Sequence, residues 1–155
     1  KYCYIVVKSN AYGHGADQII SILSTLRDED NVHGIAFAHN EEAVNIKNWN
    51  KKILILAPKL DEYFIYLINL KLDFEFTVYS IEFLKEIDHW TKSNKKVINI
   101  HLKIETGFNR LGILDCEIEK CLEIILNNKY LNLIGIATHY GDPYRYEDFN
   151  IRIAI

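Results

Sequence analysis

The chain has 155 residues, enough for one domain with its own hydrophobic core, and its 49% hydrophobic and 25% charged residues are typical of a globular protein. The formal net charge of −3 gives no electrostatic reason to expect nucleic acid or an anionic membrane as a partner. No apolar run reaches the roughly 20 residues of a membrane span. Three cysteines without a C-x-x-C pair indicate neither a disulfide framework nor a metal site. We therefore expect a cytoplasmic protein that binds no metal.

Strand-like and helix-like segments alternate along the chain. Runs of β-branched and aromatic residues predict six strands, over residues 2–7, 33–38, 52–56, 74–79, 96–104 and 133–140. Apolar residues at helical spacing follow most of these strands, over residues 14–26, 40–46, 60–70, 80–87 and 115–126. Asn40, Ser80 and Asp115 are the expected N-caps of three of these helices.

This alternation predicts an α/β fold with a parallel sheet, because a helical crossover between two strands joins parallel neighbours. Two architectures agree with the periodicity: an open doubly wound sheet, or a (β/α)8 barrel of which about six of the eight units are present. Both ends of the chain interrupt a pattern, since Lys1 directly precedes a strand and residues 149–155 stop within an apolar-polar alternation. We therefore expect a piece of a longer protein.

Four polar residues follow the ends of predicted strands, where both architectures bind their ligands. Lys8 closes the first strand, Lys103 lies at the end of the fifth, Arg110 lies just beyond it, and His139 closes the sixth. Any one of them alone is more often a solvated or structural residue. Their coincidence at one edge of the sheet indicates a functional site.

The residue types in this group favour an anionic aldehyde as the ligand. A partly desolvated lysine near other cations becomes a nucleophile toward aldehydes, so Lys8 is suited to form a Schiff base. Tyr12, expected at the start of the first helix, could donate its hydroxyl to a phosphate, as free N–H groups at helix starts do. Arg110 offers a bidentate fork for a carboxylate or phenolate. His139 could lie flat under an aromatic ring or form a hydrogen bond to it.

Three stretches of the sequence resemble motifs of the alanine racemase family. Residues 6–16, VVKSNAYGHGA, keep seven of the eight positions of the signature K-A-N-A-Y-G-H-G, with Ser9 in place of alanine. Residues 101–113, HLKIETGFNRLGI, are similar to H-x-K-x-D-T-G-M-x-R-L-G, with Glu105 and Phe108 as the two departures. Residues 135–140, GIATHY, resemble G-x-x-T-H-F, and weaker similarity at 34–44 and 76–87 lies in the same order. The resemblance covers nearly the whole chain.

The resemblance implies a fold and a role for each matched residue. The chain would form the N-terminal part of a (β/α)8 barrel, with residues 1–155 as a partial pyridoxal phosphate-binding domain. Lys8 would hold the cofactor and act as a catalytic base, Tyr12 would bind its phosphate, and Arg110 would bind its phenolic oxygen and orient the substrate. His139 would pack against the pyridine ring. Lys103 matches a lysine that is carbamylated in many members, and its alternative is an ordinary ion pair, for example with Glu105 or with a carboxylate elsewhere.

The implied activity is the interconversion of L-alanine and D-alanine, which supplies D-alanine for peptidoglycan. Racemisation requires an acid-base group on each face of Cα, and the second group would be a tyrosine from a C-terminal β-rich domain of the other subunit of a homodimer. We therefore expect this piece alone to be inactive. A racemase for serine, lysine or several amino acids, and a non-catalytic pyridoxal phosphate-binding barrel, are the alternatives. Residues 141–149 depart from the family pattern and suggest a solvated connection or a lid.

Overall fold

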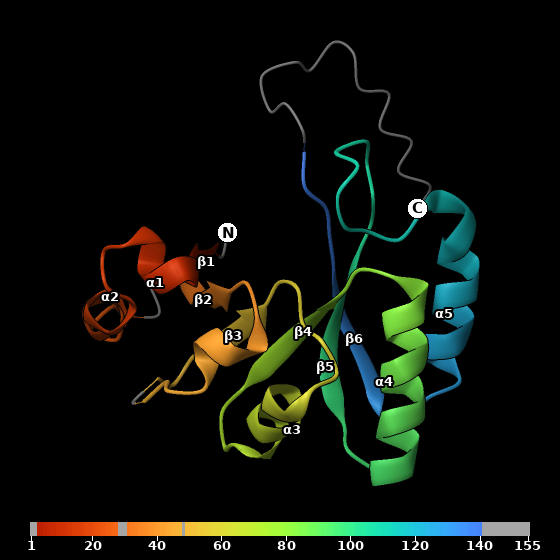
Figure 1. Cartoon of the computed structure of the whole chain (residues 1–155), viewed down its shortest axis with the longest axis horizontal. Helices are drawn as coiled ribbons and strands as arrows, with labels where there is room; N and C mark the ends of the chain where they lie inside the picture. Colours follow the sequence, from red (N-terminus) through yellow and green to blue (C-terminus); the bar gives the residue numbers. More distant parts are fainter. Residues whose placement is uncertain (1–2, 28–30, 48, 141–155) are drawn as a thin grey trace.

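The computed structural model describes residues 3–27, 31–47 and 49–140, and these form strands separated by helices (Figure 1). The strands are β1 (Cys3–Val6), β2 (Val32–Phe37), β3 (Lys52–Ile55), β4 (Phe74–Val78), β5 (Ile98–Lys103) and β6 (Leu131–Ala137). The α-helical segments are α1 (Lys8–Tyr12), α2 (Ala16–Leu23), α3 (Glu62–Asn69), α4 (Ile81–Asn94) and α5 (Ile118–Leu126). Two short 3₁₀ turns are η2 (Asn40–Ala43) and η3 (Asp115–Glu117). All six predicted strands are present, with ends that differ by up to three residues.

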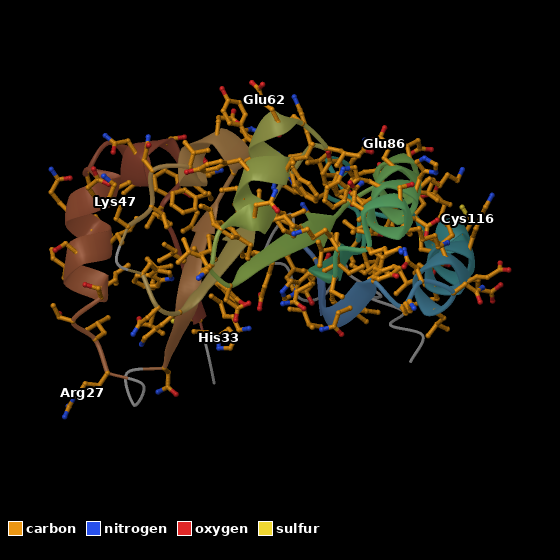
Figure 2. All side chains as sticks on the ribbon, turned by 90° about the horizontal axis from the view of Figure 1, so that it is seen from below. Arg27, His33, Lys47, Glu62, Glu86 and Cys116 are labelled. Atoms are coloured by element: carbon orange, nitrogen blue, oxygen red, sulfur yellow. The ribbon has the colours of Figure 1, made fainter. Side chains whose placement is uncertain are left out.

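The strands form one parallel sheet in the order β1-β2-β3-β4-β5-β6. A doubly wound sheet reverses its strand order at a switch point, whereas a barrel adds each strand beside the previous one. The sequential order therefore decides between the two architectures that periodicity leaves open. Figure 2 shows α2, α3, α4 and α5 following one another around the outside of the strands. The prediction of a barrel fold with six of its strands is confirmed.

The outer face of the sheet packs against the helices and forms the hydrophobic core. Phe64 on α3 contacts Phe76 on β4, with ring centroids 4.4 Å apart, and meets Phe83 on α4 edge to face at 6.3 Å. Burial of each such ring contributes about 1.5–3 kcal/mol. Other side chains on this face are fully buried, namely Ile35, Ile53, Ile55, Val78, Ile100 and Leu102. Both faces of these strands are enclosed or partly enclosed, which explains their apolar composition.

Helix starts agree with the sequence prediction at one position and differ at two. Ser80 is the N-cap of α4, and its Oγ accepts a hydrogen bond from Phe83 N at 3.1 Å. The predictions for Asn40 and Asp115 were wrong, because each is the first residue of a 3₁₀ turn rather than a cap. The side chain of Asn40 instead donates to Lys59 O and Asp61 Oδ1, at 2.7 and 2.9 Å. These hydrogen bonds connect the loop after β2 to the loop after β3, and no local sequence pattern predicts them.

The inner face of the sheet carries a polar cluster, which consists of Tyr4, Lys52, Glu75 and His101 and is called the inner cluster below. The Tyr4 hydroxyl and the His101 imidazole both donate to Glu75 Oε2, the latter at 2.7 Å. Lys52 Nζ lies 3.4 Å from Glu75 Oε1 and 2.5 Å from Asp73 Oδ2. The Glu75 side chain is only 1% exposed. It thereby joins strands β1, β3, β4 and β5 inside the barrel.

The inner cluster sets the protonation of its central carboxyl. Burial alone raises the pKa of Glu75, but hydrogen bonds from His101 and Tyr4 and the charge of Lys52 outweigh it and hold that pKa below its ordinary value. Burial, followed by the hydrogen bond to Glu75, raises the pKa of the Tyr4 hydroxyl. Glu75 is therefore an ionised carboxylate with its partners in place. A buried charge of this kind is tolerated because it is paired and hydrogen-bonded.

Candidate functional site

The site lies where the carboxyl ends of β1, β5 and β6 meet. Strand β1 ends at Val6, two residues before Lys8, whereas Lys103 is the last residue of β5. Strand β6 ends at Ala137, two residues before His139. The sequence placed Lys8 and His139 at the strand ends themselves, so both lie slightly further into the loops than expected. All three still belong to the same edge of the parallel sheet.

A left-handed turn follows Lys8. Ser9, Asn10, Ala11 and Tyr12 have φ of 51, 53, 53 and 54°, which places four consecutive non-glycine residues in the left-handed region. Each costs roughly 1–2 kcal/mol relative to right-handed geometry. The turn closes when Gly13 N donates to Ser9 O and Asn10 O, at 3.2 and 3.1 Å. The surrounding structure must therefore hold this turn against its own preference.

Tyr12 lies in a different element from the one that the sequence predicted. The sequence placed Tyr12 at the start of the first right-handed helix, but that helix, α2, begins at Ala16. Tyr12 ends the left-handed turn instead, with its side chain 61% exposed. Lys8 Nζ lies 5.8 Å from the centroid of the Tyr12 ring. Four residues make about one helical turn, so these two side chains lie on the same side of it.

The loop after β5 is shaped by Glu105. Its carboxylate accepts hydrogen bonds from Gly107 N, Asn109 N and Arg110 N, at 2.6, 2.9 and 3.2 Å. These backbone donors, Asn109 first, hold the pKa of Glu105 below its ordinary value. In the described part of the chain, Glu105 and Lys103 do not form an ion pair. The described residues therefore show no such pair, and Glu105 is engaged by its own loop.

Phe108 connects two of the expected site residues. The guanidinium carbon of Arg110 lies 4.6 Å from the centroid of the Phe108 ring. The His139 ring meets the same ring edge to face, with centroids 4.6 Å apart and an interplanar angle of 69°. The loops after β5 and β6 therefore contact each other through these three side chains.

A pair of threonines also joins these two loops, next to the ends of strands β5 and β6. Thr106 Oγ1 and Thr138 Oγ1 are 2.6 Å apart, and the Thr138 hydroxyl lies 3.0 Å from Ile104 O. Thr138 directly precedes His139, so this contact fixes the backbone from which the imidazole extends. The position of His139 therefore depends on β5 as well as on its own strand.

Positive charge dominates this end of the sheet. Among the described residues, no carboxylate lies within ion-pair distance of Lys8, Lys103 or Arg110. Burial and then the charge of Arg110 lower the pKa of Lys103, and Glu105 offsets this only in part. The pKa of His139 is lowered by burial and then by Arg110, Lys103 and Lys8. A cationic field of this kind favours a neutral imidazole and attracts an anionic ligand.

The structure thus brings together Lys8, Lys103, Arg110 and His139, with Tyr12 beside Lys8. Sequence reasoning did not assign a role to Phe108, which it noted only as a departure from a motif. It also missed Thr138 and Glu42, whose contacts are to residues more than 30 positions away. Residues 141–149, for which a connection or a lid was predicted, lie outside the described residues.

A pocket of about 330 Å³ lies beside the loops after β2 and β3 rather than over this cationic group. Its lining includes His39, Asn40, Ala57, Lys59 and Asp61, and none of the five predicted site residues. A search for concave surface alone would therefore have pointed to a different part of the same edge as the candidate site.

Among the described helices, none is both long enough and apolar enough to cross a membrane.

Fold and site together define a parallel (β/α) barrel domain with a cationic, lysine-bearing site at the carboxyl ends of its strands. The family model "Alanine racemase, N-terminal domain" matches residues 1–150. The chain belongs to this family.

The relatives agree with this assignment. Alanine racemase 1 of Bacillus subtilis is 34% identical over 140 residues, which are 88% of this chain and 34% of that protein. Alanine racemase of Clostridium perfringens is 34% identical over 155 residues, with 94% of this chain and 38% of that protein covered. The chain therefore spans about a third of the length of these curated relatives.

Solved structures show the same fold. Alanine racemase of Clostridium difficile 630 matches with a TM-score of 0.72 and 29% identity, over 87% of this chain and 35% of that one. Alanine racemase of Oenococcus oeni matches with a TM-score of 0.74 and 27% identity, over 94% of this chain and 42% of that one.

Proposed function

We propose that this chain is the cofactor-binding N-terminal part of an alanine racemase that uses pyridoxal phosphate to interconvert L-alanine and D-alanine. One observation carries the proposal. Lys8 stands at the carboxyl end of the first strand of a barrel from this family, in a field of cations that no carboxylate of the described residues pairs. An amine in such a field suits a ligand that is both an aldehyde and an anion.

The residues present fit pyridoxal phosphate. Its phosphate and phenolic oxygen need donors, and Arg110 and the exposed Tyr12 hydroxyl supply them. Its aldehyde needs an amine, which Lys8 supplies. Its flat ring needs an apolar or aromatic neighbour, and the contact between Phe108 and His139 offers one beside Arg110.

Each residue then has a distinct task. When bound, pyridoxal phosphate supplies an electron sink that stabilises negative charge at Cα of an amino acid. Lys8 Nζ holds the cofactor and, once released, removes or returns the Cα proton on one face. The Tyr12 hydroxyl donates to the phosphate. The Arg110 guanidinium donates to the phenolic oxygen and orients the substrate, and the His139 imidazole packs against the ring.

Lys103 is proposed to be carbamylated. Carbon dioxide adds to a neutral amine at Nζ with loss of one proton, so the reaction is helped by the burial and the Arg110 charge that lower the pKa of Lys103. The resulting carbamate anion would accept hydrogen bonds from Arg110 and fix its direction. It would also supply the negative partner that the described residues do not give to Arg110.

The remaining functions belong to the longer protein. We place the second acid-base group, a tyrosine, in a C-terminal β-rich domain of the other subunit of a homodimer, in the cytoplasm, with D-alanine used for peptidoglycan. Two further strands would close the barrel between β6 and β1. The 72% exposure of Ile136 on the edge strand β6 supports a further neighbour there.

The test is chemical labelling of the full-length gene product. The protein is reduced with borohydride and digested, and mass spectrometry locates any pyridoxyl group. We expect the label on Lys8, and racemisation of alanine exceeding that of serine in the unreduced protein. A label on another lysine, or on none, would refute the assignment of Lys8. A label on Lys8 with faster racemisation of serine would instead reject alanine as the substrate.

A further inference from the structure

Glu42 lies on η2, after β2, yet its carboxylate reaches the turn that follows Lys8. Its Oε1 accepts a hydrogen bond from Ser9 N at 2.7 Å, across 33 positions of sequence. Its Oε2 accepts from Ala38 N at 2.7 Å and from His39 N at 3.3 Å. We infer that Glu42 is a positioning residue that holds the left-handed turn, and with it Lys8 and Tyr12, in the geometry that receives the cofactor.

The turn needs such an anchor because its backbone is unfavourable. Ser9 N belongs to the first residue with left-handed geometry, and Glu42 is its acceptor. Further along, Ala11 N donates to Val7 O at 2.9 Å, so the later part of the turn is tied to the end of the first strand. The side chain of Ala11 is buried, whereas those of Ser9 and Tyr12 are exposed. Packing therefore secures one side of the turn, and Glu42 secures the other.

A purely local role for Glu42 does not account for both oxygens. Closing its own 3₁₀ turn requires the bond to His39 N, which Oε2 makes together with the bond to Ala38 N. Oε1 is directed instead at a different loop of the sheet. Hydrogen bonds to an ionised carboxylate are stronger than neutral ones, so one charge links the loops after β1 and β2. These loops carry Lys8 on one side and the pocket residues His39 and Asn40 on the other.

The test compares Glu42→Gln with Glu41→Gln in the full-length protein. Glutamine has one acceptor oxygen, so its amide N–H groups must face either Ser9 N–H or the N–H groups of Ala38 and His39. One of the two loops therefore loses its acceptor. Glu41 is the adjacent residue, is exposed, and carries the same charge, so Glu41→Gln is the matched control. Glu42→Ala removes both links and is the decisive variant, with Glu41→Ala as its control.

The first readout does not require the cofactor. Hydrogen exchange of the cofactor-free protein should show amides of residues 8–13 exchanging about tenfold faster in Glu42→Ala, as expected when one hydrogen bond to a charged group is lost. In Glu42→Gln, only the loop that faces the amide N–H groups should exchange faster, while amides of β4 and β5 should be unchanged in both variants. Faster exchange throughout the protein, or unchanged exchange at residues 8–13 in Glu42→Ala, would overturn the inference.

The second readout rests on the proposed function. Affinity for pyridoxal phosphate, measured by absorbance titration, should fall about tenfold in Glu42→Ala and stay unchanged in Glu41→Ala. Faster exchange at residues 8–13 with unchanged affinity would overturn the link to the cofactor. If the wild-type protein binds no pyridoxal phosphate, the proposed function fails, and hydrogen exchange still decides whether Glu42 anchors the turn.

Discussion

Two polar regions of the same sheet use charge in opposite ways. In the inner cluster, the single carboxylate of Glu75 is met by Tyr4, Lys52 and His101, so each charge has a partner. At the carboxyl end, Lys103 and Arg110 lie close enough to lower the pKa of His139, and no carboxylate of the described residues pairs either cation. Removing one partner of a buried, paired charge leaves the other group uncompensated and costs stability, whereas accumulated like charges repel one another unless a ligand of opposite charge binds there.

The difference shows how a structural network is distinguished from a candidate functional site. Both regions contain a lysine, a histidine and half-buried polar groups, so residue type alone does not distinguish them. The pairing of charges does. We therefore expect substitutions in the inner cluster to affect stability first, and substitutions at the carboxyl end to affect ligand binding and activity first.

The largest effect is expected for Lys8→Ala. Loss of the amine removes both the cofactor attachment and an acid-base group, so racemase activity of the full-length protein should fall by about a thousandfold or more. The thermal midpoint of the cofactor-free protein should change little, because Lys8 has no ion pair among the described residues. Lys120→Ala, at an exposed position of α5, is the control and should keep its activity. Retained activity in Lys8→Ala would remove Lys8 from the mechanism.

Glu75→Ala should give the next largest effect, on stability. It removes the acceptor for Tyr4 and His101 and leaves Lys52 without its buried partner, which should cost about 3 kcal/mol of unfolding free energy. Urea unfolding of the full-length protein measures this loss. Glu86→Ala removes an exposed carboxylate from α4 (Figure 2) and should change stability by less than about 0.5 kcal/mol. Equal costs for the two variants would contradict a structural role for the inner cluster.

The same carboxylate should make stability depend on pH in the acid range. The folded pKa of Glu75 lies below its ordinary value of 4.5, so its ionised form stabilises the fold fully above that pH. This contribution is lost as the pH falls through the lower folded pKa. The difference in unfolding free energy between wild type and Glu75→Gln should therefore be constant near neutrality and shrink below pH 4.5. A difference that grows on acidification would show that the folded pKa of Glu75 lies above its ordinary value.

The smallest effect is expected for Arg110→Gln at the carboxyl end. Burial and then the charge of Arg110 lower the pKa of His139, so removing that charge should raise it toward its ordinary value of 6.5 without reaching it. Titration of the His139 ring by NMR in the cofactor-free protein measures this rise, with Lys120→Gln as the control. An unchanged pKa would mean that the charge of Arg110 does not act on the His139 imidazole.

Much of the fold could be predicted because strands and helices leave periodic apolar patterns. The predicted strand at 74–79 is β4 with one extra residue, and Ser80 caps α4 as its hydroxyl chemistry suggests. The predicted strand at 133–140 was displaced toward the C-terminus, since β6 is Leu131–Ala137. Strand ends depend on which neighbouring backbone groups pair, and this information is not local.

The candidate site could be predicted only in part. Lys8, Lys103, Arg110 and His139 could be predicted as site residues because a parallel sheet gathers its strand ends at one edge. The partner of Arg110, Phe108, was found only in the structure, because a ring contact between two loops has no sequence pattern. The left-handed turn was also missed, because non-glycine residues rarely adopt it in succession.

The sequence by itself determined the alternation of strands and helices, the family motifs, and which side chains carry nucleophilic or cationic chemistry. These follow from local periodicity and residue type. Only the tertiary structure decided the sequential strand order, the hand of the turn after Lys8, the pairing of Glu75 with three other strands, and the reach of Glu42 to Ser9. These features depend on groups that are far apart in the chain and meet only when the sheet forms.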